Sequence, residues 1–315
     1  MPRECRHPCK CGCLGRSAGP GGASLGTSAN AWLEGGRQND DMTASQLKVM
    51  VVLDPTRFVQ PALEKAMAIA QLSGAQLRLY CCCSEEQQRA PEVFHEVERW
   101  VERLARAVRS EGMVTDTKVE WSPQWRMAIV AAAGACGSGL VVKTASPASS
   151  ARRALLASAD VELLRHCGCP VLLVKTHAPW GGGTVLAAAQ VAPEDEAHEN
   201  VRDAVLKSAR AIAVQLGFEL HVVTVDPQST GWFDRTGFAA RCQVPHQHVH
   251  VKRGNPVEAI CELTQELAAD LVVLGTVARQ DAKAARVGQT AEKLAYAVQA
   301  DVLAIPPTTR EPGAP

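Results

Sequence analysis

The chain repeats itself at a fixed offset. The segment Ala128–Val174 matches Ala259–Ile305 without a gap, so every matched position lies 131 residues later (259 − 128 = 131). Apolar runs carry the match: Leu140–Val142 with Leu271–Val273, and Val171–Val174 with Val302–Ile305. A period of this length is too long for a solenoid and fits two domains of ordinary size. We therefore expect a duplicated module.

Each copy alternates short apolar runs with helical patterns. An apolar run over Val49–Leu53 stops at Asp54, and a helix is predicted over Pro61–Leu72 before Gly74 ends it. A second helix is predicted over Glu92–Arg109, where apolar residues recur at steps of three and four. Strands that alternate with helices indicate a parallel sheet covered on both faces. The expected fold class is α/β, with two tandem domains of five parallel strands each.

Segments without apolar periodicity bound the predicted domains. Residues 1–45 form a Cys- and Gly-rich tail, which buries too little apolar surface to offset the entropy of ordering. We expect disorder there, and a chain that starts at Met42 is an open alternative. The remaining assignments are a first domain, a linker, a second domain and a disordered tail, at residues 46–176, 177–183, 184–307 and 308–315.

Composition argues against several functions. Lys plus Arg number 33 and Asp plus Glu also number 33, so no net charge attracts nucleic acid or an anionic membrane. No apolar run reaches the roughly 18 residues that suggest a transmembrane helix. The 12 cysteines fall in unlike places and follow no signal peptide, which predicts reduced thiols in a cytoplasmic protein. Without a Ser-His-Asp set or a Gly-x-Ser-x-Gly elbow, catalysis has little support.

Several passages resemble the universal stress protein family. They are the first strand ending in Asp54 and the passages Val251–Ile260, Asp270–Thr276, Gly288–Leu294 and Cys169–Val174. The resemblance implies Rossmann-like (adenine nucleotide alpha hydrolase-like) domains that pair as an intramolecular pseudo-dimer, with a homodimer and an unidentified protein partner as further expectations. It also implies a cytoplasmic role in resistance to DNA-damaging agents and other stresses.

The same resemblance implies a degenerate nucleotide loop. Nucleotide-binding members hold phosphates in a Gly-x2-Gly-x9-Gly-[Ser/Thr] loop, where glycine lets backbone N–H groups approach oxygen, and contact adenosine through an Asp. In the second domain these positions read Gly275, Ala278, Gly288 and Gln289, with Thr290 one place late and Gln190 in place of the Asp. The first domain keeps Asp54 but reads Thr144, Pro147 and Ala157. ATP is therefore a candidate cofactor of the second domain, and the alternative is that Gly275 and Gly288 serve turns.

Two further groups are candidate ligand sites. His246, His248 and His250 alternate, and on a strand they project from one face as ligands for zinc, copper or nickel. Because positions i and i+4 of a strand are far apart, two histidines with an outside ligand are expected, and an exposed polar face is the alternative. Lys143 and Lys175 lie at strand ends near the carboxyl edge of the sheet, where ligands of open α/β folds bind, so their ammonium groups are candidates to bind an anion. The alternative is that both side chains extend to solvent.

Three hypotheses of function follow. The first is a non-catalytic regulatory binding protein, and the second is a weak nucleotide binder or ATPase. The third is a sensor of metal or of a hydrophobic ligand, which uses the histidine segment or the space left by the shortened middle of the second unit.

Overall fold

The structure, a computed structural model, describes residues 47–84, 91–146, 158–180, 183–190, 195–226, 234–276 and 289–307. The predicted tails, Pro147, Ala157, Ala278 and Gly288 lie outside these ranges. The first half contains β1 (Lys48–Val52), α1 (Pro61–Ser73), β2 (Gln76–Cys83), α3 (Pro91–Ser110), β3 (Thr115–Trp121), α4 (Trp125–Ala135), β4 (Leu140–Thr144), α6 (Ala159–His166) and β5 (Val171–Val174).

The second half repeats this order of elements. It contains β6 (Thr184–Ala188), α7 (Glu196–Leu216), β7 (Glu219–Asp226), α8 (Arg235–Cys242), the 3-10 helix η1 (His246–His248), β8 (Val249–Arg253), α9 (Pro256–Glu266), β9 (Leu271–Gly275), α10 (Gln289–Ala297) and β10 (Asp301–Ile305). The helix between β7 and β8 is shorter than α3, which occupies the same place in the first half.

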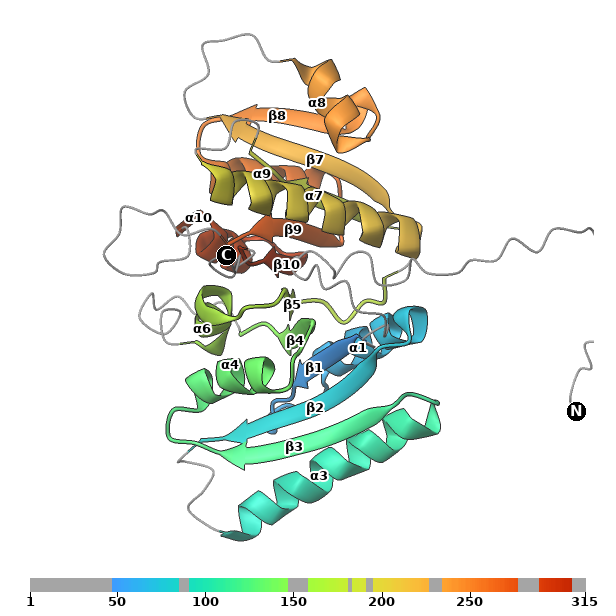
Figure 1. Ribbon diagram of the computed structural model, residues 1–315, viewed down its shortest axis with the longest axis vertical. Coiled ribbons are helices and arrows are strands. Elements are labelled where there is room, and N and C mark those ends of the chain that lie inside the picture. Colours follow the sequence, from blue (N-terminus) through green and yellow to red (C-terminus); the bar gives the residue numbers. More distant parts are fainter. Residues whose placement is uncertain are drawn as a thin grey trace, which may run out of the picture.

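The described strands form one continuous sheet in the order β3-β2-β1-β4-β5-β10-β9-β6-β7-β8 (Figure 1). Five strands in each half pair in parallel, and β5 pairs with β10 in antiparallel register, Leu172 opposite Leu303. The predicted fold class, two tandem α/β domains, is confirmed.

Local sequence explains the helix ends. Pro61 opens α1, where its missing N–H costs no hydrogen bond, and Gly74 ends the helix in the left-handed region with φ of 69°. Gly217 ends α7 in the same way, with φ of 67°. At the start of α7 the Asp195 carboxylate accepts the His198 N–H and caps the helix.

Two hydrophobic cores lie on opposite faces of the sheet. In β1, Val49 and Val51 face one core while Met50 and Val52 face the other, the alternation expected for a strand covered on both sides. Helices α1, α3, α7 and α8 cover the first core, and α4, α6, α9 and α10 cover the second. Each core runs through both halves, so the duplicated modules share their interior. No described helix is long and apolar enough to cross a membrane.

A buried polar group fastens the junction between the halves. Asp301, at the start of β10, is wholly buried and accepts the backbone N–H groups of Lys175 and Thr176 at 2.7 and 3.1 Å. It also accepts the indole N–H of Trp180 at 3.0 Å and lies 3.3 Å from the ammonium of Lys65 on α1. That ammonium stands 4.4 Å from the centroid of the Trp180 ring. We call Asp301, Lys65 and Trp180 the seam network, which joins both halves to the segment after β5.

Candidate functional site

The carboxyl edge of the first half is closed by its own side chains. In the order β2-β1-β4, the crevice for ligands of open α/β sheets opens between β1 and β4. Thr144, the last residue of β4, is buried there, and its hydroxyl accepts the N–H of Ala62 at 3.2 Å. Ala62 is the second residue of α1, so a protein hydroxyl takes up an N–H that a bound anion would otherwise use.

Asp54, the predicted adenosine contact, shapes the loop after β1. Its carboxylate accepts the N–H and the hydroxyl of Thr56 at 3.0 and 2.6 Å, and it pairs with the guanidinium of Arg57 at 3.2 Å. Arg57 reaches across to the carbonyl of Ala145 after β4, at 3.5 Å. The carboxylate keeps 43% of its side-chain surface exposed while these groups hold it in place.

Lys143 serves an internal carboxylate. Its ammonium lies 2.7 Å from Asp160, which is wholly buried in the first turn of α6. The other oxygen of Asp160 accepts the N–H of Ser146, after β4, at 2.7 Å. The Lys143 ammonium is therefore already paired within the protein, between the start of α6 and the loop after β4.

Lys175 is likewise engaged within the protein. Its ammonium donates to the carbonyl of Val298 at 2.5 Å, just after the end of α10. Burial lowers the pKa of Lys175 to about 8, although nearby carboxylates, Asp160 and Asp301 among them, favour its charged form.

This lowered pKa predicts a pH dependence of stability. Between pH 8 and the ordinary lysine pKa near 10.5, the unfolded chain binds more protons at Lys175 than the folded chain, so its contribution to folding improves as pH rises. We expect the free energy of unfolding of the wild type, minus that of Lys175→Met, to increase between pH 8 and 10 in urea titrations. A difference that stays constant over this range contradicts the prediction.

The second half departs from the first at each of these places. Gly275 stands in β9 where the repeat has Thr144, and a side chain there would overlap Val201 of α7. Gly275 thus permits close packing of α7 on the sheet. Thr290 is exposed in the first turn of α10, next to Gln289, and Gln190 is exposed after β6. By the same repeat, Leu274 and Ala291 replace Lys143 and Asp160, so this half carries no equivalent of the internal ion pair at those positions.

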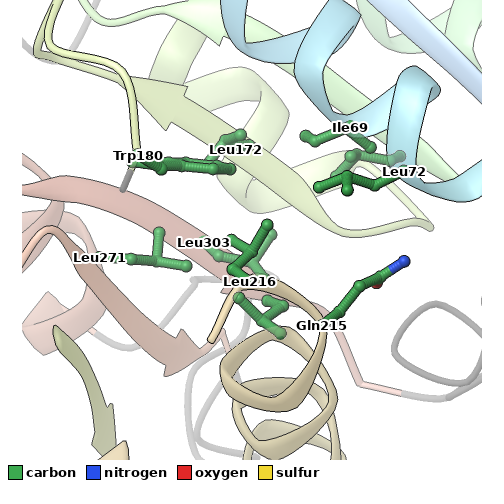
Figure 2. A pocket seen from close by; sticks show the side chains of 10 residues that line it. Ile69, Leu72, Leu172, Trp180, Gln215, Leu216, Leu271 and Leu303 are labelled. Atoms are coloured by element: carbon green, nitrogen blue, oxygen red, sulfur yellow. The ribbon is translucent and has the colours of Figure 1, made fainter. Parts of the chain in front are cut away.

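An apolar pocket lies on the junction between the halves. Figure 2 shows side chains of α1 and β5 facing those of α7, β9 and β10 across it, with Trp180 at one side. The enclosed space amounts to about 20 Å³, on the order of a single water. The lining residues are Ile69, Leu72, Leu140, Leu172, Trp180, Ile212, Gln215, Leu216, Leu271 and Leu303. In this conformation the pocket is a packing seam, and a hydrophobic ligand would need the helices to separate.

The histidines are arranged differently from the sequence prediction. His246 and His248 belong to the 3-10 helix η1, not to a strand, because Pro245 precedes the turn and β8 begins only at Val249. His246 is exposed and lies outside the cluster that forms around His248. The prediction that all three imidazoles project from one face of a strand is therefore wrong.

His248 and His250 instead meet residues of β7. His248 Nε2 lies 3.0 Å from one Glu219 oxygen, and His221 Nε2 lies 3.6 Å from the other. His221 Nδ1 lies 2.9 Å from His250 Nε2. The His221 and His248 rings stack with centroids 4.3 Å apart. Glu219 and His221 were not identified from the sequence; the signal was two polar residues spaced by two on a strand that pairs with β8.

The surroundings favour the neutral form of two of these imidazoles. Burial, then the neighbouring His248, lowers the pKa of His221. Burial, then His221, Arg235 and Lys252, lowers the pKa of His250 to about 4. A neutral imidazole has a free lone pair, which is the form that binds metal ions.

Comparison with known proteins accounts for the duplication. The sequence profile of the universal stress protein family matches the chain twice, over residues 47–175 and 183–306. The chain belongs to the universal stress protein family. Its described strands and helices, together with the two matches, make it a tandem member, and membership implies a role in stress response.

Relatives of the same tandem length are known. The chain is 28% identical over 296 residues to Universal stress protein E of Escherichia coli (strain K12), covering 82% of this chain and 93% of that protein. A solved structure of a functionally unknown protein from Pseudomonas aeruginosa PAO1 has a TM-score of 0.72 at 29% identity, covering 88% of this chain and 95% of that one. A universal stress protein from Archaeoglobus fulgidus DSM 4304 shares the fold, with a TM-score of 0.66 at 16% identity, covering 84% and 97%.

Proposed function

We propose that this universal stress protein is a cytoplasmic, non-catalytic binding protein that regulates a stress response, and that its first domain no longer binds nucleotide. The observation that supports this most is the buried Asp160 carboxylate, paired with Lys143 at 2.7 Å and bonded to the Ser146 N–H. Because Asp160 already engages the Lys143 ammonium, a phosphate would have to compete with a buried carboxylate for this cation, which is unfavourable. The Thr144 hydroxyl, which accepts the Ala62 N–H, further disfavours phosphate binding because it takes up an N–H group at the start of α1.

The wider role rests on relatives. The likeness to Universal stress protein E supports a role in stress response, and resistance to DNA-damaging agents is the form of that role that we propose. A regulatory protein of this kind acts through a partner, and the two halves, joined in one continuous sheet, would present it with a single surface. Deleting the encoding gene should lower survival after ultraviolet irradiation, and the intact gene should restore it. Equal survival of both strains contradicts the DNA-damage role.

Weak nucleotide binding by the second domain is a second candidate. It is favoured by Leu274 and Ala291, which leave that domain without the internal lysine–carboxylate pair. Gly275 and Thr290 are the described residues of the degenerate loop there, and Ala278, Gly288 and the side chain of Gln289 lie outside the described part of the chain.

Calorimetric titration of the full chain with Mg-ATP separates the two candidates. If the second domain binds, the stoichiometry is one, and Leu274→Lys/Ala291→Asp, which imports the pair of the first domain, abolishes binding. Ala297→Asp adds a charge at the exposed far end of α10 and is the matched control. Thr290→Ala, at an exposed position, gives a second test if the double variant is unfolded by circular dichroism.

Each result has one meaning. If Mg-ATP produces no heat of binding and releases no phosphate, the result supports the purely regulatory protein. Two bound nucleotides would contradict the proposed loss of binding in the first domain. Steady release of phosphate from ATP would contradict the non-catalytic assignment.

A further inference from the structure

The cluster at the start of β7 has the composition of a metal site. Glu219 and His221 lie two residues apart on β7 and so share one face of the strand, and His248 approaches them from η1. The Glu219 carboxylate oxygen and the two imidazole nitrogens all lie within 4.8 Å of one another. Two histidines with one carboxylate are a known ligand set of zinc, which leaves a fourth position for water or an external ligand.

Hydrogen bonds orient both imidazoles toward Glu219. His248 Nδ1 lies 3.2 Å from the carbonyl of Leu220, which only accepts, so Nδ1 carries the hydrogen. The lone pair of a neutral His248 is then on Nε2, 3.0 Å from the Glu219 carboxylate. A lone pair facing a carboxylate is favourable only with a positive charge between them, either a metal ion or a proton.

His250 orients the imidazole of His221. Its Nε2 lies 2.9 Å from His221 Nδ1, and when it accepts that hydrogen the lone pair of His221 is on Nε2, toward Glu219. Metal-ligating histidines commonly donate their other N–H to a fixed acceptor, which sets the tautomer and the ring orientation. The register of β7 and β8, with Val223 opposite His250, is what brings this acceptor into place.

We propose that Glu219, His221 and His248 bind a divalent transition metal of the zinc class, with His250 and the Leu220 carbonyl orienting the two imidazoles. The Glu219 side chain is 58% exposed, so the ion enters from solvent, while His221 and His248 are 10% and 14% exposed. The two rings stack at an interplanar angle of 15°, which holds their Nε2 atoms on the same side, toward Glu219.

The test uses the full chain, freed of metal with EDTA and titrated with zinc chloride in a calorimeter. The wild type binds one zinc ion at this site, and Glu219→Gln and His248→Asn, which each remove a ligand, weaken that binding by more than the roughly 10–100-fold typical of a lost orienting partner. His250→Ala, which removes only the orienting bond, weakens it by a smaller factor. His246→Ala is the matched control, since His246 lies in the same turn and outside the cluster, and it leaves binding unchanged.

Thiols are the competing ligands, because the chain has 12 cysteines. Cobalt(II) as a second probe distinguishes them, since thiolate ligands produce an intense charge-transfer band in the near ultraviolet and imidazole or carboxylate ligands do not. Zinc that persists in Glu219→Gln and His248→Asn, or a thiolate band in place of a nitrogen–oxygen spectrum, overturns the proposal. So does the absence of zinc binding in the wild type. Glu219→Gln sits at an exposed position, so its loss of binding is not a loss of folding.

Discussion

Asp301→Ala lowers the free energy of unfolding by about 3–5 kcal/mol, the cost of leaving one member of a buried ion pair without its partner. The side chains of Asp301 and Lys65 are 0% and 4% exposed, so the remaining ammonium has little access to water. The substitution also frees the N–H groups of Lys175 and Thr176 and the indole of Trp180. Urea denaturation followed by tryptophan fluorescence measures the loss.

Two further variants show whether the buried pair is the cause. Asp116→Ala removes an exposed carboxylate that pairs with Arg78, and a surface pair of this kind contributes at most about 1 kcal/mol. Adding Lys65→Met to Asp301→Ala removes the unpaired charge and should recover part of the stability. If Asp301→Ala costs no more than Asp116→Ala, the seam network does not hold the halves together.

Gly275→Val destabilises the protein by about 1–3 kcal/mol, the range for inserting a side chain into a packed core. A Cβ atom on Gly275 overlaps Cγ1 of Val201, and Val205 lies beside it on the same face of α7. The φ angle of Gly275 lies outside the left-handed region, so valine can adopt the same backbone conformation. The destabilisation therefore comes from the volume of the added side chain. Thermal and urea denaturation measure it.

A compensating substitution tests this explanation. Val201→Ala alone leaves a cavity and destabilises, but in the Gly275→Val background it relieves the overlap, so the double variant is more stable than the sum of the two losses predicts. Strict additivity would show that the two residues do not compete for space. Loss of ligand binding in Gly275→Val alone is therefore no evidence for a phosphate loop until its stability has been measured.

Some of the candidate sites were visible in the sequence and others were not. Lys143 and Lys175 were placed correctly at strand ends, but their partners, Asp160 and the carbonyl of Val298, are 17 and 123 positions away. His248 was identified, whereas Glu219 and His221 were not, because local alternation says nothing about which strand lies beside β8. The role of Gly275 was ambiguous for the same reason, since only the position of Val201 shows what the missing side chain makes room for.

Residue patterns alone predict the duplication, the α/β class and the ends of several helices. These follow from local and periodic properties: apolar runs repeated at a constant offset, Pro61 at a helix start, and Gly74 where φ must be positive. Tertiary structure alone decided that β5 pairs with β10, that a wholly buried Asp301 meets Lys65, and that Glu219 and His221 meet His248. The physical reason is that these contacts depend on strand order and register between segments far apart in the chain, which residue spacing does not encode.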